Sequence, residues 1–373
     1  MNIGIDARMY GPSVGGGGLG RYVEQLVGQL AQQNTKNRYV LFVLNTEQAK
    51  TVEQLGFEAV VTNIHWYGLR EQISLPKIID SYKLDLIHFP HWNVPLKLET
   101  PFVVTIHDLI LLEEPLSAKA TTRHPLIYGI KYRLFKMVLR HALTASKKII
   151  AVSNYTKSSI NRFYPNIAAD KIEVVYEGLT PLSSTADSPN TSIPPKPYFL
   201  YVGNAYPHKN LESLLHAFSF FHKLHPNVHL VLAGRHDVFY ERLKKELDEI
   251  DVPNTSVTFV KNPSDSELAT LYRNATLYLF PSRSEGFGLP PLEAMSFGIP
   301  VAASNTSSLP EILGDAALYF APDDIEKMVE IMEQTLEDES LRKHLTQKGS
   351  EQIKKYSWKQ MTQEIQTIYK NCG

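Results

Sequence analysis

Short apolar runs alternate with stretches of helical periodicity along the first half of the chain. The runs predict strands over residues 2–6, 38–44, 59–64, 85–89, 102–108, 147–153 and 171–178. Between the first two runs, apolar side chains recur on one helical face over residues 19–33. Continuously apolar strands separated by helices are typical of parallel sheets that are covered on both faces.

The same alternation starts again after a segment of different composition. Residues 181–197 are rich in Ser, Thr and Pro without an apolar period, which predicts a linker. Further strands are predicted over residues 198–204, 228–234, 256–260, 277–282, 300–304 and 316–320. We therefore predict two doubly wound α/β domains, residues 1–180 and 198–356, that face each other across a cleft, and a final amphipathic helix.

Composition agrees with a two-domain globular protein and excludes several classes. A length of 373 residues exceeds the usual size of one core, and 38 basic against 39 acidic side chains argue against a nucleic-acid binder. The single cysteine, Cys372, excludes a disulfide framework and favours a reducing, cytoplasmic compartment. Polar residues interrupt the N-terminal run, so no signal peptide is expected, and no run reaches the roughly 20 apolar residues of a spanning helix.

The segment "SRSEGFGLPPLEAM" at residues 282–295 carries the most informative chemistry. It places Glu285 and Glu293 around a strand-to-helix turn, with Gly288 allowing a close backbone approach and Pro290 suited to the first helical turn. The start of a helix attracts anions such as a diphosphate, and the two carboxylates would accept hydrogen bonds from hydroxyl groups of a nucleotide sugar. The alternative is that Glu293 only favours the helix start and Glu285 is a solvated loop residue.

Longer stretches resemble the retaining glycosyltransferases of family 4 over nearly the whole chain. The stretches are "GIDAR", "GLGRY", "VVTIHDL", "IIAVSNYTKSSI", "YVGNAYPHKNLESLL", "LATLYRNA", the region 281–322 and "YSWKQM". The resemblance implies the GT-B fold, in which two Rossmann-like domains face each other and the last helix, here 357–373, crosses back to the first domain. It also implies transfer of a hexose from a nucleotide sugar with retention of configuration.

The resemblance assigns donor-binding roles around the turn. Glu285 would lie near the donor sugar and diphosphate, and Glu293 would bind the ribose hydroxyls. The backbone amides of Phe287, Gly288 and Leu289 would lie at the phosphates.

Cations from other strand ends complete the expected donor site. Lys209 matches the family lysine that neutralises the diphosphate, although a surface lysine before a helix is the alternative. Asn204 stands where the family often has an arginine, so Arg235 at the end of the next strand is our candidate for the second cation. Lys261, after a later strand, is expected near the base.

Two further elements of the first domain match the family. His107 matches the histidine that reaches the donor sugar, so His107, Lys209 and Glu285 are the expected catalytic residues; a satisfied core histidine is the alternative for His107. Gly17 and Gly18 belong to a glycine-rich loop expected beside the donor phosphate. A dinucleotide fingerprint is disfavoured there, because eight residues separate the first strand from the glycines and no acidic partner follows about 20 positions later.

Metal-independent chemistry is expected. The chain contains no D-x-D motif of the kind that holds a divalent cation on a diphosphate. His88 and His91 lack an apparent third ligand, which favours an acceptor-side or structural role.

Residues 123–148 are basic and periodically apolar. This segment either contacts an anionic membrane surface near a lipid-linked acceptor or packs its apolar face inward as an ordinary domain helix.

We expect a retaining hexosyltransferase of cell-surface polysaccharide synthesis. GDP-mannose is the first donor prediction, with a UDP-hexose or rhamnose donor as the alternative and a glycan or lipid-linked sugar as acceptor. An NAD-dependent oxidoreductase and a non-catalytic relative are the competing classes.

Overall fold

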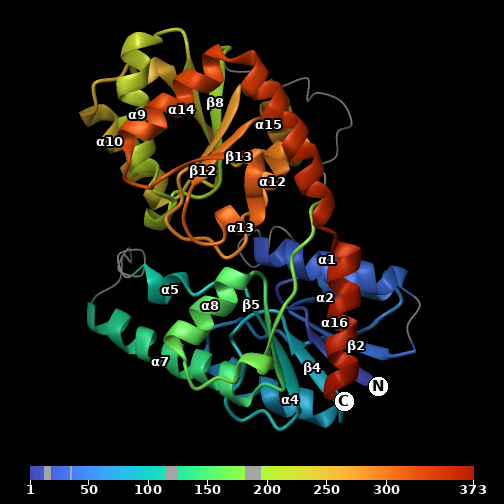
Figure 1. Ribbon diagram of the computed structural model, residues 1–373. Helices are drawn as coiled ribbons and strands as arrows, with labels where there is room; N and C mark the ends of the chain where they lie inside the picture. Colours follow the sequence, from blue (N-terminus) through green and yellow to red (C-terminus); the bar gives the residue numbers. More distant parts are fainter. Residues whose placement is uncertain (12–17, 34–35, 115–124, 181–194) are drawn as a thin grey trace. The chain divides into compact units, whose positions relative to one another are not determined.

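The computed structural model describes residues 1–11, 18–33, 36–114, 125–180 and 195–373 (Figure 1). The chain forms two compact units. The first comprises Met1–Leu109, Thr121–Gly178 and Ser357–Gly373, and the second comprises Ile110–Ala120 and Leu179–Tyr356. Most of the predicted linker, 181–197, lies outside the described residues.

The first unit contains a seven-stranded sheet in the order β3-β2-β1-β4-β5-β6-β7. Every neighbouring pair is parallel. The strands are β1 (Asn2–Asp6), β2 (Arg38–Val43), β3 (Glu58–Val61), β4 (Leu86–Phe89), β5 (Phe102–Ile106), β6 (Lys148–Ala151) and β7 (Ile172–Val174).

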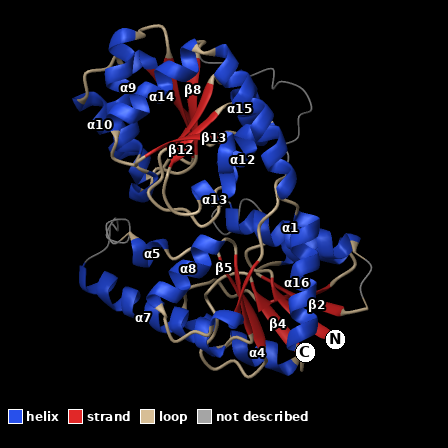
Figure 2. Ribbon diagram, in the orientation of Figure 1, coloured by secondary structure: helices blue, strands red, loops and turns tan. Residues whose placement is uncertain are grey.

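Helices cover both faces of this sheet (Figure 2). They are α1 (Gly18–Gln32), α2 (Thr46–Gln54), α3 (Leu69–Ile73), α4 (Leu75–Ser81), α7 (Pro125–Ala145), α8 (Asn154–Phe163), the 3-10 turn η1 (Ala169–Lys171) and α16 (Trp358–Cys372). The apolar face predicted for α1, including Tyr22, Leu26 and Leu30, is buried.

The second unit contains a six-stranded parallel sheet in the order β10-β9-β8-β11-β12-β13. The strands are β8 (Tyr198–Val202), β9 (His229–Gly234), β10 (Val257–Lys261), β11 (Leu277–Phe280), β12 (Val301–Ser304) and β13 (Ala317–Phe320). The helices are α5 (Ile110–Glu113), α9 (Leu211–Leu224), α10 (Val238–Glu249), α11 (Asp265–Asn274), α12 (Leu289–Ser296), α13 (Leu309–Leu313), α14 (Ile325–Glu337) and α15 (Glu339–Gln352). Short 3-10 turns occur at η2 (Pro207–Lys209), η3 (Asn254–Ser256), η4 (Gly314–Ala316) and η5 (Ile353–Lys355).

The predicted α/β class with parallel sheets is confirmed. Each predicted strand is present, and the predictions overran mainly at the carboxyl ends, where the chain continues past the last ladder hydrogen bond. For example, the run predicted as 102–108 pairs only as β5, which ends at Ile106.

The C-terminal helix α16 belongs to the first unit, as predicted. It lies beside α1, where the rings of Trp358 and Tyr22 are 6.2 Å apart (Figure 1). A buried polar chain fixes its other end. His88 Nδ1 lies 2.6 Å from the Tyr369 hydroxyl, and His88 Nε2 lies 2.8 Å from Thr105 Oγ1. Burial lowers the pKa of His88 to about 3, so the imidazole is neutral and can accept one of these hydrogen bonds.

Replacing Tyr369 by Phe would remove the hydroxyl and keep the ring. The buried Nδ1 of His88 then loses its partner on α16, so we expect the free energy of unfolding in urea to fall by about 1–3 kcal/mol. Thr367→Val removes an exposed hydroxyl from the same helix and should cost less than about 0.5 kcal/mol. Equal losses in the two variants would show that the buried hydrogen bond does not anchor α16.

Candidate functional site

The predicted donor-site residues lie at one edge of the second sheet. β8 and β11 are neighbours, but the chain leaves β8 toward β9 and leaves β11 toward β12 on the opposite side. This reversal is the switch point where parallel α/β sheets bind ligands outside the carboxyl ends of their strands. Lys209 lies in the connection after β8, and Glu285 lies in the connection after β11.

Lys209 and Glu285 form an ion pair. The distance from Lys209 Nζ to Glu285 Oε1 is 2.5 Å, and the two side chains are 13% and 11% exposed. The ammonium group also lies 5.5 Å from the centre of the Phe280 ring. The structure therefore joins two predicted catalytic residues that are 76 positions apart.

Hydrogen bonds clamp the two connections together. Asn210 adopts the left-handed conformation (φ 59°), which Asn tolerates better than most residues. Its amide donates to the carbonyl oxygens of Pro281 (3.2 Å) and Pro322 (2.7 Å). The Arg283 backbone N–H donates to the His208 carbonyl oxygen at 2.7 Å. These contacts position Lys209, and the sequence patterns did not single out Asn210 or Arg283.

The turn before α12 is held from the next connection. The Ser308 hydroxyl donates to the carbonyl oxygens of Glu285 and Phe287, each at 3.0 Å, and the Glu285 backbone N–H donates to Ser307 Oγ at 3.0 Å. Gly288 precedes the helix with φ 107°, and a Cβ there would lie 2.9 Å from Leu309 Cδ2. This position therefore favours glycine for both its backbone conformation and its space.

The start of α12 has the features of an anion site. Leu289 is its first residue and a proline occupies its first turn, as predicted. The positive end of the helix dipole lies where the connection after β11 enters α12, and Lys209 lies in the connection after β8. Hydrogen bonds join these two connections, so both positive groups belong to one clamped region.

Glu285 and Glu293 are both buried, each with 8% of its surface exposed. The Tyr272 hydroxyl donates to Glu293 Oε2 at 3.4 Å. The alternative in which Glu285 is a solvated loop residue is therefore wrong. A buried carboxylate needs hydrogen-bond partners, and Tyr272 supplies one for Glu293.

The other predicted donor residues of the second unit lie along the same sheet edge. Asn204 Oδ1 accepts from the Tyr206 backbone N–H at 3.3 Å, so this side chain shapes the turn after β8. Arg235 follows β9 and Lys261 ends β10; both are exposed, and neither forms an ion pair with a described residue. The structure thus places these cations one and two strands away from β8 without joining them to Lys209.

In the first unit, His107 follows β5 and uses both ring nitrogens. Nδ1 lies 2.9 Å from Glu177 Oε1, and Nε2 lies 3.0 Å from the Pro90 carbonyl oxygen. Sequence reasoning did not single out Glu177, which comes after β7 and is 5% exposed. Both nitrogens are thus engaged within the first unit, whereas the expected contact to a sugar hydroxyl needs one of them.

Of the predicted glycines, Gly17 lies outside the described residues. Gly18 is the first residue of α1, and a Cβ there would meet nothing within 4 Å. Packing therefore does not require glycine at position 18.

His91 and His88 do not form a metal site with other described residues. His91 Nδ1 lies 3.0 Å from Asn93 Oδ1, and His88 belongs to the chain that anchors α16. Within the described ranges, no group of three or more histidine, cysteine, aspartate or glutamate side chains could hold a metal ion.

Comparison with known proteins agrees with this geometry. Residues 16–181 match the model of glycosyltransferase family 4, and residues 184–352 match that of the group 1 glycosyl transferases. The O-antigen chain mannosyltransferase B of Escherichia coli is 30% identical over 385 aligned residues, which cover 95% of this chain and 96% of that protein. The chain belongs to glycosyltransferase family 4. The predicted family and enzyme class are confirmed, and the oxidoreductase alternative is excluded.

Other similar proteins support the fold of this family 4 glycosyltransferase. The O-antigen chain mannosyltransferase RfbU of Salmonella typhimurium is 29% identical, with 69% of this chain and 67% of that protein covered. Sucrose-phosphate synthase from Thermosynechococcus elongatus superposes with a TM-score of 0.76 at 19% identity, covering 100% and 98% of the two chains. Anabaena HepE, solved with UDP and glucose, gives a TM-score of 0.76 at 18% identity and covers both chains fully.

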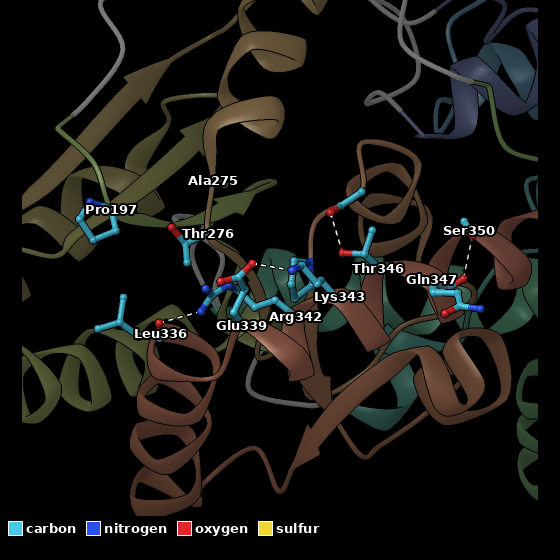
Figure 3. A pocket seen from close by; sticks show the side chains of 12 residues that line it. Pro197, Ala275, Thr276, Leu336, Glu339, Arg342, Lys343, Thr346, Gln347 and Ser350 are labelled. Atoms are coloured by element: carbon cyan, nitrogen blue, oxygen red, sulfur yellow. Dashed lines mark hydrogen bonds and ion pairs between the residues drawn. The ribbon is translucent and has the colours of Figure 1, made fainter.

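The second unit of the glycosyltransferase also has a groove of about 700 Å³, which lies away from Lys209 and Glu285 (Figure 3). Pro197, Thr276 and Pro300 in its lining directly precede β8, β11 and β12, so it lies at the amino ends of these strands. Its cations are already engaged. Arg342 donates to the carbonyl oxygens at the end of α14, and Lys343 pairs with a glutamate one turn earlier in α15. We therefore do not assign the donor to this groove.

Across the described part of the glycosyltransferase, the helices are too short or too polar to cross a lipid bilayer.

Proposed function

We propose that the chain is a retaining hexosyltransferase that moves mannose from GDP-mannose to a glycan or lipid-linked acceptor in cell-surface polysaccharide synthesis. The observation that carries the proposal is the ion pair between Lys209 and Glu285 beside the start of α12. The choice of mannose is supported by the relatives from Escherichia coli and Salmonella typhimurium, which are mannosyltransferases.

In this proposal the diphosphate takes the place of Glu285 as the main partner of Lys209. The ammonium group and the start of α12 then stabilise the negative charge that develops on the departing diphosphate. Glu285, released from the pair, accepts a hydrogen bond from the donor sugar, and Glu293 accepts from the ribose hydroxyls. Lys261 and Arg235 border the expected position of the base and phosphates along the same sheet edge.

A UDP-hexose is the alternative donor, because Anabaena HepE was solved with UDP and glucose. Rhamnose stays open as the sugar. The two carboxylates contact hydroxyl groups that all of these donors share, so they do not distinguish among them.

We infer that attack occurs on the face from which the leaving group departs. The carboxylate nearest the proposed diphosphate site, Glu285, is paired with Lys209 and is needed to bind the sugar. The bond from the anomeric carbon to the phosphate oxygen breaks, the bond to the acceptor oxygen forms on the same face, and the acceptor proton passes to the departing phosphate oxygen. Domain closure is expected to accompany binding.

Within the segment 123–148, we propose that helix α7 contacts the membrane. Ile130, Leu134 and Met137 are 61%, 49% and 47% exposed and lie on one face at spacings of four and three residues. Val138 and Leu139 are buried, so α7 has one apolar face inside the unit and a second one outside.

Charges around the outer face favour an anionic lipid surface over a protein partner of mixed charge. Four exposed cations flank it, and α7 contains no acidic residue. The cations are Lys131, Arg133, Lys136 and Arg140.

The donor assignment is tested with full-length variants. We expect Lys209→Met to lower kcat/KM for GDP-mannose by about 10²–10³-fold, because a preorganised charge on the leaving group is lost. Glu293→Gln should weaken GDP binding in calorimetry by roughly 10–100-fold, since hydrogen bonds to a charged acceptor contribute about 1.5–3 kcal/mol. Glu337→Gln, an exposed carboxylate on α14, should change neither quantity. Unaltered GDP-mannose turnover in Lys209→Met would contradict the proposed function. If the unmodified protein transferred sugar only from UDP-glucose, the donor would be a UDP-hexose instead of GDP-mannose.

Vesicle sedimentation tests the lipid contact. The protein should bind phosphatidylglycerol vesicles at low salt and not phosphatidylcholine vesicles, and the double variant Ile130→Gln, Leu134→Gln should lose this binding. Leu224→Gln, which replaces a leucine that is 69% exposed on α9, is the matched control. Failure to bind anionic vesicles contradicts the assignment, as does concentration-dependent self-association that only the double variant abolishes.

A further inference from the structure

The two hydrogen bonds of His107 define its protonation state. A backbone carbonyl oxygen can only accept, so the Nε2 atom that lies 3.0 Å from the Pro90 oxygen carries a proton. A carboxylate also accepts only, so the Nδ1 atom that lies 2.9 Å from Glu177 Oε1 carries a second proton. The geometry is that of an imidazolium with both N–H groups donating.

The surroundings of the ring favour this charge. Burial lowers the pKa of His107, but the hydrogen bond and charge of Glu177, the charge of Asp108 and the Pro90 oxygen outweigh it, so the pKa is raised above 6.5. The titratable groups that face the ring from neighbouring elements are Tyr22 on α1, whose ring is 4.7 Å away, His88 on β4 and His91 after β4.

Both neighbouring histidines are neutral. Burial, together with the charge on His107, lowers the pKa values of His88 and His91 to about 3. The imidazolium of His107 is therefore the cation of this histidine cluster, and Glu177 is its carboxylate partner.

We propose that Glu177 is a positioning residue that keeps His107 positively charged and fixed at the carboxyl end of β5, so that the transfer reaction depends on the charge of His107. The pair also ties together the connections that follow β4, β5 and β7, because His107 bonds to Pro90 and Glu177 at once. The effect of the His107 charge on the transfer reaction rests on the proposed function, whereas the positive charge of His107 does not.

The charge of this pair makes stability depend on pH in a definite direction. Since the pKa of His107 is raised in the folded protein, its contribution is complete below the unfolded value of about 6.5 and is lost as pH rises through the folded pKa. Glu177→Gln removes the contribution of the charged pair to stability. The stability of this variant should therefore fall less as the pH rises.

Nitrogen NMR of the full chain, labelled with ¹⁵N-histidine, tests the proposal directly. We expect both ring nitrogens of His107 to be protonated at pH 6, with a titration midpoint above 6.5 that falls in Glu177→Gln; His107→Gln assigns the signal. Glu173→Gln is the matched control, because this carboxylate on β7 pairs with Lys148 at 2.8 Å and should leave the midpoint unchanged. A single protonated nitrogen at pH 6, which would put the proton on Glu177, or an unchanged midpoint in Glu177→Gln, overturns the proposal.

Kinetics separates a role in the reaction from a structural one. The alkaline limb of kcat against pH should move to lower pH in Glu177→Gln, and Glu177→Asp should restore part of the shift. If Glu177→Gln does not fold, the NMR midpoint and pH profile of Glu177→Met, which also lacks the charge, decide instead: values equal to those of the unmodified protein at every pH would overturn the role of Glu177. An imidazolium by NMR without any transfer activity would count against the proposed function and leave the charge assignment intact.

Discussion

A buried cation needs an anion, and this constraint organises the second unit. Lys209 is mostly buried, and Glu285 supplies its counter-charge from a strand connection that is distant in sequence. The connections after β8 and β11 meet at the switch point of the sheet. The hydrogen bonds of Asn210 and of the two serines that hold the turn before α12 lie at this point. In the proposed function, the same arrangement keeps the cation in place for a diphosphate.

The first unit uses the same principle with a different pair. His107 and Glu177 join strand ends through a buried charge, whereas His88 is kept neutral and joins the sheet to α16. His88 on β4 and His107 just after the neighbouring β5 therefore differ in charge because only His107 faces a carboxylate. Family membership alone would not separate these roles.

The sequence patterns predicted the strands and the parallel sheets, because buried parallel strands are continuously apolar. The turn around Glu285 carries recognisable residues, and the resemblance to the family pointed to Lys209. Contacts made across the sheet edge had no such signal. Glu177 lies 70 positions from His107, and the hydroxyls of Ser307 and Ser308 resemble those of any loop. The two apolar faces of α7 are also inseparable by periodicity, because both repeat every three or four residues and only packing decides which is buried.

The central claim is that a sugar diphosphate binds where α12 begins. Hydrogen exchange of the full chain, measured by mass spectrometry with and without GDP-mannose and with UDP-glucose in parallel, tests it most directly. The account predicts slower exchange in the connection 203–210 and across 285–293, with at least one of the two donors. Protection confined to the glycine-rich segment near residue 17, with no change around α12, would contradict it.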